Sequence, residues 1–204
     1  RSGRLWVGTN GKGVYLYNRE NDKFTQYLGD NSGETLFGEN IYKMCDYGDE
    51  LVIGIHEGKL RKLNKRKNIL TDVNAPEVHY KIIRDVACFD DELWVGTQSG
   101  VYVINELKNK ISHIYNDPMC SYSLSDNQIG RIYRDRENGI WIGTNLGGVN
   151  YCPQRGIEFT RHIPLSRPYT ISSKRVRELV EDEEGNIWVG TEDAGINIYD
   201  PHTG

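Results

Sequence analysis

The sequence lacks the features of a membrane-spanning helix and of a zinc site. Its 204 residues contain no run of 18 or more apolar residues, so no segment is expected to cross a bilayer as a helix. Cys45, Cys88, Cys120 and Cys152 form no C-x-x-C pair and have no histidine at zinc-finger spacing. These spacings favour unpaired thiols packed in or near strands, and they indicate no particular redox compartment.

A start methionine and a signal peptide are also absent. The chain begins at Arg1, so we expect it to be a piece of a longer protein. A large excess of either sign of charge is also absent, because the net charge is only −4. Such a balance gives no electrostatic footprint for nucleic acid or for an anionic membrane surface. Neither is an expected partner of this segment.

Groupings of catalytic side chains are missing as well. The five histidines follow no common spacing, and the sequence contains neither a G-x-S-x-G elbow nor a histidine pair at metal-binding spacing. The glycine-rich loop Gly8–Gly13 is followed by strand-like residues, whereas a phosphate-binding loop precedes a helix. The turn Asp135–Gly139 lacks the later carboxylate of a calcium loop. We predict no catalysis, no metal and no cofactor in this segment.

One short motif, Leu/Ile-Trp-Val/Ile-Gly-Thr followed by a loop and another glycine, occurs throughout the chain. It contains all four tryptophans and a glycine two residues after each: Trp6 and Gly8, Trp94 and Gly96, Trp141 and Gly143, Trp188 and Gly190. A fifth copy around Val52 lacks the Trp and the Thr. From position 6 through 52, 94 and 141 to 188 the steps are 46, 42, 47 and 47 residues. A regular period of this size built from short strands is typical of propeller blades, whereas helical repeats need long amphipathic stretches.

The predicted fold is therefore all-β, a β-propeller fragment of about five four-stranded blades. We expect a single domain over residues 1–204, with the first blade lacking its innermost strand and the last lacking its outermost strand. The expected blades lie at about residues 4–28, 41–73, 82–115, 129–162 and 176–200.

The alternation of the Trp strand predicts how neighbouring blades meet. Period-two geometry puts Trp6 and Gly8 on one face of the first strand and Leu5, Val7 and Thr9 on the other. Since both faces carry apolar groups, both must be covered. We expect the glycine to let the adjacent sheet come close and the tryptophan to fill the gap that widens away from the axis. The open faces of the two end blades predict self-association of the fragment.

The strand order also predicts which loops share one edge. The loops after the Trp strands and the entries into the next blades should meet at the edge where propellers usually bind ligands. Amide, guanidinium and carboxylate side chains there suit sugar hydroxyls, although the same residue types populate any β-turn. The candidates are Asn10, Lys12, His56, Glu57, Gln98, Asn127, Arg131, Asn145, Arg175, Glu192 and Asp193.

The repeat resembles that of a known family. Gly139–Thr144 (GIWIGT), preceded by Ser123–Asn127 (SLSDN), is similar to the two-component regulator propeller repeat, and the resemblance extends over essentially the whole chain. It is specific because five copies stand in phase. The copy at Leu51–Ile55 departs from the pattern, since it has neither the Trp nor the Gly-Thr pair.

The resemblance implies a piece of the periplasmic ectodomain of a hybrid two-component histidine kinase of Bacteroidetes. In such proteins two seven-bladed propellers and a small β-sandwich precede a helix through the inner membrane, with kinase and DNA-binding parts inside the cell. It further implies sensing of glycan-derived oligosaccharides by a homodimeric full-length protein that controls transcription. On this interpretation the segment is not itself an enzyme, and it is tied to the membrane only through a helix that it does not contain.

A second hypothesis remains open at this stage. A propeller enzyme of the streptogramin-lyase-like type would need an acid and a base converging at the mouth of the ring. His56 and Glu57 are the adjacent pair that could supply them.

Overall fold

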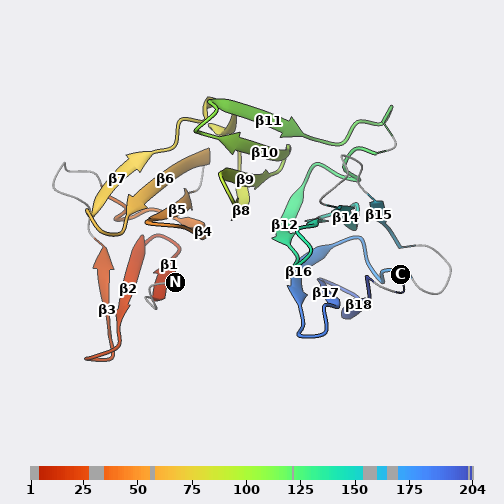
Figure 1. The fold of residues 1–204 in the computed structure, drawn as a ribbon. Helices are drawn as coiled ribbons and strands as arrows, with labels where there is room; N and C mark the ends of the chain where they lie inside the picture. The colour runs from red at the N-terminus through yellow and green to blue at the C-terminus, as the bar shows by residue number, and fades with distance from the viewer. Residues whose placement is uncertain are drawn as a thin grey trace. The chain divides into compact units, whose positions relative to one another are not determined.

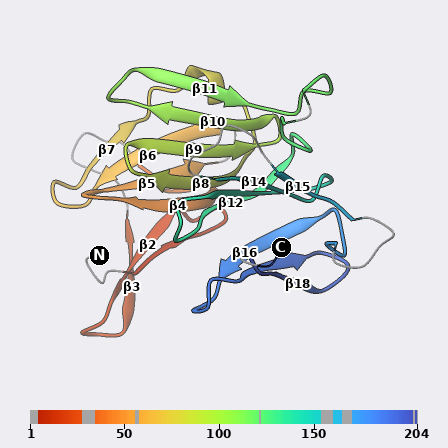
Figure 2. The ribbon, with the colours of Figure 1, turned by 45° about the vertical axis from the view of Figure 1, so that its right-hand side comes forward.

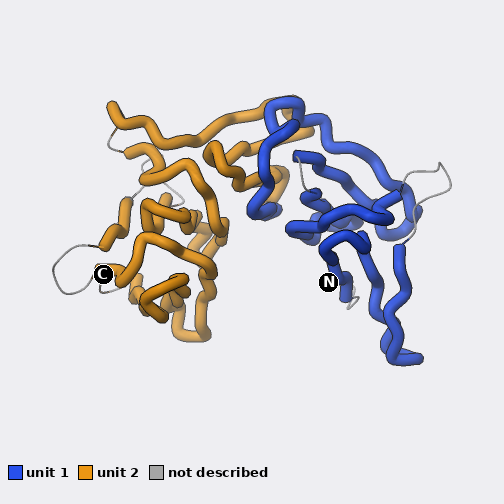
Figure 3. The backbone as a smooth tube through the Cα atoms, turned by 180° about the vertical axis from the view of Figure 1, so that it is seen from behind, with its two compact units in different colours: residues 1–88 blue, residues 89–204 orange. Residues whose placement is uncertain are grey.

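A computed structural model of the chain describes residues 5–27, 35–55, 58–120, 122–153, 160–164, 170–201 and 203. These residues form eighteen β-strands in five antiparallel sheets and one short 3₁₀ turn, η2 (Pro76–Val78). The chain divides into two compact units, unit 1 (residues 1–88) and unit 2 (residues 89–204), which Figure 3 shows in two colours.

Each sheet is a meander in which strands adjacent in sequence lie side by side (Figure 1). We call the sheets blades one to five in chain order. Blade one has three strands and blade two has four: β1 (Leu5–Gly8), β2 (Val14–Asn18) and β3 (Lys23–Tyr27), then β4 (Ile41–Tyr47), β5 (Glu50–Ile55), β6 (Lys59–Asn64) and β7 (Ile69–Asp72).

The remaining blades follow the same plan, and the division between the units falls near the end of the first strand of blade three. Its strands are β8 (Ile83–Phe89), β9 (Glu92–Thr97), β10 (Gly100–Asn105) and β11 (Lys110–Ile114). Blade four consists of β12 (Ile129–Arg134), β13 (Ile140–Thr144), β14 (Val149–Cys152) and β15 (Thr160–His162). Blade five consists of β16 (Val176–Glu181), β17 (Ile187–Thr191) and β18 (Ile196–Tyr199). Figure 2 shows blades four and five from the side.

The all-β propeller class and the number of blades predicted from the sequence are confirmed. The three-stranded sheets are the first and the last, which agrees with a first blade that lacks its innermost strand and a last blade that lacks its outermost one. The organisation of residues 1–204 as a single domain stays a prediction.

A close approach of sheet to sheet recurs at the glycine of each motif except the last. A Cβ atom on Gly8 would lie 2.5 Å from Ile41, and one on Gly96 would lie 2.6 Å from Ile129. Such distances are below any ordinary carbon contact, so only glycine fits. The same approach joins Gly54 to Val86 at 2.9 Å and Gly143 to Val176 at 2.7 Å. Each contact joins a Trp-strand position to the inner strand of the following blade.

The four tryptophans occupy the same face as these glycines but differ in how far they are covered. Trp141 is only 1% exposed, in a cluster with Val176 and Leu179 of blade five. Trp188 is 39% exposed, because no further sheet among the described residues covers blade five. Trp6 and Trp94 are half-buried. Burial of this side chain therefore depends on the next blade rather than on its own sheet.

Replacing Trp141 with alanine should lower the free energy of unfolding by about 3–5 kcal/mol, because a large buried side chain leaves both lost contacts and a cavity. The matched control is Trp188→Ala, which removes the same side chain from a site without a covering blade. We expect it to cost roughly 1 kcal/mol or less. Denaturant unfolding of the two variants checks this, and equal losses would contradict the assignment of Trp141 to a blade interface.

The glycine approach can be tested in the same way. Gly143→Ala should destabilise the protein by about 1–3 kcal/mol, since its new methyl group would overlap Val176. In Gly190→Ala the nearest atom would be Glu178 Cβ at 3.6 Å, an ordinary contact, so stability should stay the same or rise slightly. Thermal unfolding of both variants measures the difference. A tolerated Gly143→Ala would show that the blades can separate without loss.

Candidate functional site

The predicted ligand residues of blades four and five lie in equivalent pairs at one edge of each blade. The backbone N–H of Asn145 donates to the carbonyl oxygen of Gln128 at 2.8 Å, and the Asn145 amide Nδ2 donates to Gln128 Oε1 at 3.3 Å. At the same place in blade five, the N–H of Glu192 donates to the carbonyl oxygen of Arg175 at 3.0 Å. Each pair joins the loop after a Trp strand to the entry of that blade's inner strand.

Charged side chains cluster at this edge of blade five. Glu192 Oε2 lies 3.8 Å from Arg175 Nη1 and also accepts a hydrogen bond from the guanidinium of Arg177. All three side chains are exposed, as is that of Asp193 in the same loop. Exposed ion pairs contribute little to stability, so these groups can exchange a partner for a ligand at small cost.

Two other candidates are held in structural contacts. Arg131 in β12 forms a bidentate pair with Glu178 in β16, with Nε–Oε1 and Nη2–Oε2 distances of 2.9 and 2.8 Å. Asn127 Oδ1 accepts the backbone N–H of Asn116 at 2.7 Å and so holds the loop that enters blade four. Glu178 was not predictable as a partner of Arg131 from the sequence, because the pairing depends on the register between two blades.

The remaining candidates are dispersed. Asn10 and Lys12 are exposed in the loop between β1 and β2, where Gln26 Nε2 donates to the Lys12 carbonyl at 2.7 Å. Gln98 is half-buried in the turn between β9 and β10. His56 and Glu57 lie outside the described residues. The acid and base that the enzyme hypothesis needs are therefore not placed, and that hypothesis is not favoured.

A carboxylate-centred turn marks the opposite edge of blades four and five. Asp135 Oδ1 accepts the backbone N–H groups of Glu137 and Gly139 at 3.0 and 2.7 Å, while Oδ2 accepts Trp141 Nε1 at 2.7 Å. The carboxylate thus joins the hairpin to the tryptophan of its own blade. Both carboxylate oxygens accept N–H groups, so the oxygen lone pairs that a calcium ion would need are already engaged. No group of three potential metal ligands occurs in the part of the chain that the structure describes.

Asp182 repeats this turn in blade five. Its carboxylate accepts the indole N–H of Trp188 at 2.8 Å and the backbone N–H of Asn186 at 2.9 Å. Hydrogen bonds from Trp188 first, and from the Asn186 side chain next, stabilise the ionised form and lower the pKa of Asp182 to about 2.

This pKa predicts a pH dependence. Because the folded-state pKa of Asp182 lies below that of an unfolded aspartate, its ionised form favours the folded protein above about pH 4. That contribution should disappear as the pH falls from about 4 to about 2. Titration of the Asp182 carboxyl carbon by NMR measures it, and Trp188→Phe, which removes the indole donor, should raise the pKa toward its ordinary value. An unchanged pKa in that variant would contradict the role of Trp188.

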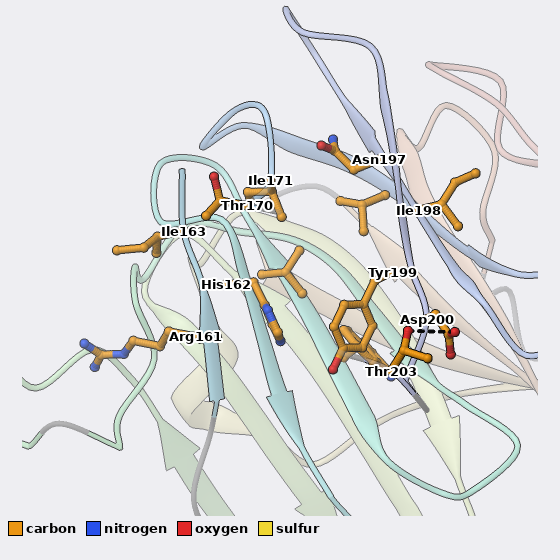
Figure 4. Close-up of a pocket in the computed structure, with 13 residues that line it drawn as sticks. Arg161, His162, Ile163, Thr170, Ile171, Asn197, Ile198, Tyr199, Asp200 and Thr203 are labelled. Carbon is orange, nitrogen blue, oxygen red and sulfur yellow. Dashed lines mark hydrogen bonds between the residues drawn. The ribbon is translucent and has the colours of Figure 1, made fainter. Parts of the chain in front are cut away.

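One hollow of unit 2 lies between blades four and five and has a volume of about 550 Å³ (Figure 4). Trp141, Val149, Val189 and Ile198 form apolar walls, and polar groups are fewer. The other lining residues are Arg161, His162, Ile163, Thr170, Ile171, Asn197, Tyr199, Asp200 and Thr203.

Aromatic rings form one side of this cavity. The ring of Tyr199 lies 4.9 Å from that of His162 and 5.3 Å from that of Trp141. Burial lowers the pKa of His162, and its Nε2 atom has no hydrogen-bond partner among the described residues. The Arg161 side chain points away from these rings (Figure 4) and donates to the carbonyl oxygen of Ser123. The rings provide stacking surfaces rather than a nucleophile with its base.

A second hollow, of about 690 Å³, lies between blades three and four. Its lining contains one ion pair: Arg134 Nη1 donates to Asp90 Oδ2 at 2.6 Å, and the guanidinium lies 5.0 Å from the centre of the Phe89 ring. Trp94 Nε1 donates to Glu92 Oε2 at 3.1 Å. None of the described candidates from the sequence lines either hollow.

The fold and these sites define a propeller whose described groups are suited to hydrogen bonding and stacking. Residues 123–146 and 170–193 match the model of the family described as "Two component regulator propeller". Each match extends from the loop before an inner strand to the loop after the Trp strand. The chain therefore contains repeats of the two-component regulator propeller family, and the resemblance found in the sequence is confirmed.

Three known proteins with similar sequence or fold are much longer than this chain. Histidine kinase P4 of Formosa agariphila is 24% identical over 151 residues, which are 70% of this chain and 11% of that protein. The extracellular domain of the putative hybrid two component system BT3049 from B. thetaiotaomicron superposes with a TM-score of 0.72 at 23% identity, covering 97% of this chain and 25% of that one.

PorZ, a surface component of the type-IX secretion system of Porphyromonas gingivalis, has the same TM-score of 0.72 at 16% identity, covering 96% of this chain and 30% of that one. At these identities the structural likeness shows the fold alone. No helix in the described ranges is long and apolar enough to span a membrane.

Proposed function

We propose that this chain is part of the extracytoplasmic sensing propeller of a hybrid two-component regulator. The observation that carries the proposal is that each matched family repeat coincides with the inner strand and the Trp strand of one blade, together with the loops on either side of them. The curated relative is a histidine kinase, and the structural neighbour BT3049 is the extracellular domain of a putative hybrid system. In this proposal the segment lies in the periplasm, while the membrane helix and the kinase belong to other parts of the protein.

The proposed ligand is an oligosaccharide derived from a glycan. Support comes from the edge where Asn145 meets Gln128 and where Arg175 meets Glu192. Sugar hydroxyls both donate and accept hydrogen bonds, so amide, guanidinium and carboxylate groups at one edge are complementary to them. The exposed Asp193 extends the same edge.

The proposed relay of ligand binding depends on contacts that connect this edge to the interfaces between blades. Arg131 and Glu178 lie on inner strands that begin at this edge, and their ion pair joins two blades. A ligand that binds to these side chains would change the preferred packing of one blade on the next. In the homodimeric full-length sensor such a change would bias the intracellular kinase and so control transcription.

An exposed apolar face on blade five supports the expected association of the isolated chain with itself. Val180, Trp188 and Ile198 stand directly opposite one another across three strands. Their exposed fractions are 54, 39 and 58%, unusually high for apolar side chains that share a sheet face. A covering blade or a second copy of the chain would bury them.

Thermal unfolding of the intact ectodomain against a panel of glycan-derived oligosaccharides tests the sensing role. A ligand present at about 100 times its dissociation constant adds roughly 2.7 kcal/mol to the stability of the folded state, so the melting temperature should rise by several degrees.

Arg175→Ala should lower the apparent affinity for the ligand by about an order of magnitude and so reduce the rise in melting temperature. Glu184→Ala, an exposed change at the other end of the same blade, is its control and should leave the shift unchanged. Absence of a shift across the panel, or equal loss in both variants, would contradict sugar binding at this edge.

A further inference from the structure

The inner strands of adjacent blades are joined by two successive side-chain contacts, which we call rungs. In unit 2 the first rung is the Arg131–Glu178 ion pair between β12 and β16. The second is the hydrogen bond from the Tyr133 hydroxyl to Glu181 Oε2, at 2.9 Å. A bulge just before Arg131, and another just before Glu178, places both first-rung residues at the same point of their strands.

Unit 1 repeats this geometry between β4 and β8. Gly54 approaches Ile83 and Val86 in the way that Gly143 approaches Val176 and Leu179, which fixes the register of the two inner strands. Lys43 follows the same bulge in β4 as Arg131 does in β12. Its Nζ atom lies 3.2 Å from Asp85 Oδ1, so this ion pair is the first rung of unit 1.

The second rung of unit 1 is a pair of thiols. In unit 2, Tyr133 follows Arg131 by two residues, and Glu181 follows Glu178 by three. The same steps from Lys43 and Asp85 in unit 1 lead to Cys45 and Cys88. Each thiol lies close enough to the other to shift its pKa, and the Cys45 thiol also donates to the carbonyl oxygen of Asp46 at 3.7 Å. Both side chains are half-buried, so a small reagent can reach them. Donation by the Cys88 thiol lowers the pKa of Cys45, and the same bond raises the pKa of Cys88. Cys45 is therefore the better nucleophile of the two.

The thiol rung lies in the blade that lacks the tryptophan. Cys45 stands directly opposite Val52 in its sheet, whereas Tyr133 stands opposite Trp141. Val52 and Ile53 are fully buried but supply less area between blades than an indole. A covalent link at the second rung would strengthen the junction that has lost its large aromatic side chain.

We propose that Cys45 and Cys88 form a reversible disulfide that links the inner strands of blades two and three. The oxidant is a disulfide of the glutathione class. The Cys45 thiolate attacks one sulfur of that disulfide, forming a mixed disulfide and releasing one thiolate. The Cys88 thiolate then attacks Cys45 Sγ, which releases the second thiolate. Two protein thiols are oxidised, and one disulfide is reduced to two thiols.

The experiment uses the whole chain with Cys120 and Cys152, both in unit 2, replaced by serine. Oxidised glutathione should consume both remaining thiols and leave a monomeric chain lighter by two hydrogen atoms, with peptides containing Cys45 and Cys88 linked in a non-reducing digest. Closing a loop of this length should raise the melting temperature on the order of 10 °C, and a dithiol reductant should reverse the rise.

Cys45→Ser in the same background is the matched control, and it should show neither the intrachain link nor the thermal shift. Stable glutathione adducts on the two thiols, or links between chains, would overturn the proposal, as would thiols that stay free in excess oxidant. Peptide mapping of the oxidised chain with all four cysteines gives the same answer should the double serine variant fail to fold, because only a Cys45–Cys88 peptide pair supports the proposal.

Discussion

The close approach of one sheet to the next at a single glycine is the constraint on which the blade packing depends. With a side chain at Gly8, Gly54, Gly96 or Gly143, the inner strand of the following blade could not reach its position. The apolar residues that meet these glycines, such as Val176 and Leu179, belong to the same clusters that bury the tryptophan. One small residue in each motif therefore sets the distance at which a large one can fill the remaining gap.

The polar contacts of the inner strands follow from this spacing. Once Gly143 lies against Val176, Arg131 and Glu178 face each other across β12 and β16, and Tyr133 reaches Glu181. Bidentate guanidinium–carboxylate pairing demands a fixed distance and orientation, which the apolar contact supplies. Hydrogen bonds thus fix how the inner strands of neighbouring blades align, while apolar contacts supply most of the packing. The same alignment positions the loops at the candidate ligand edge.

Much of this fold was predictable from the sequence, because the residues that repeat in each blade have strong steric requirements. The Trp-Val/Ile-Gly-Thr motif, counted together with its degenerate copy around Val52, recurs at intervals of 42 to 47 residues and indicated the strand, the face and the close approach together. The exposure of Trp188 follows from the same reasoning applied to a blade with no successor among the described strands. Strand alternation alone was sufficient for these conclusions.

Side-chain partners were much less predictable. Arg131 was expected near a ligand and instead lies in a bidentate pair, because its partner 47 residues away is revealed only when the register between blades is known. All four cysteines are free, as expected, but the proximity of Cys45 to Cys88 was not predicted, since no local spacing connects residues on separate inner strands. The carboxylate turns at Asp135 and Asp182 were closer to expectation, because a turn with its own tryptophan is a local structure.

The charges at the first rung change sign from each blade to the next: Lys43, Asp85, Arg131 and Glu178. Within each unit the pair of neighbours is therefore attractive. Duplication or loss of one blade inside a unit would bring two like charges together at hydrogen-bonding distance, whereas duplication of two consecutive blades would preserve the alternation. The electrostatic repeat of these inner strands is accordingly a pair of blades, even though the repeat visible in the sequence is a single blade.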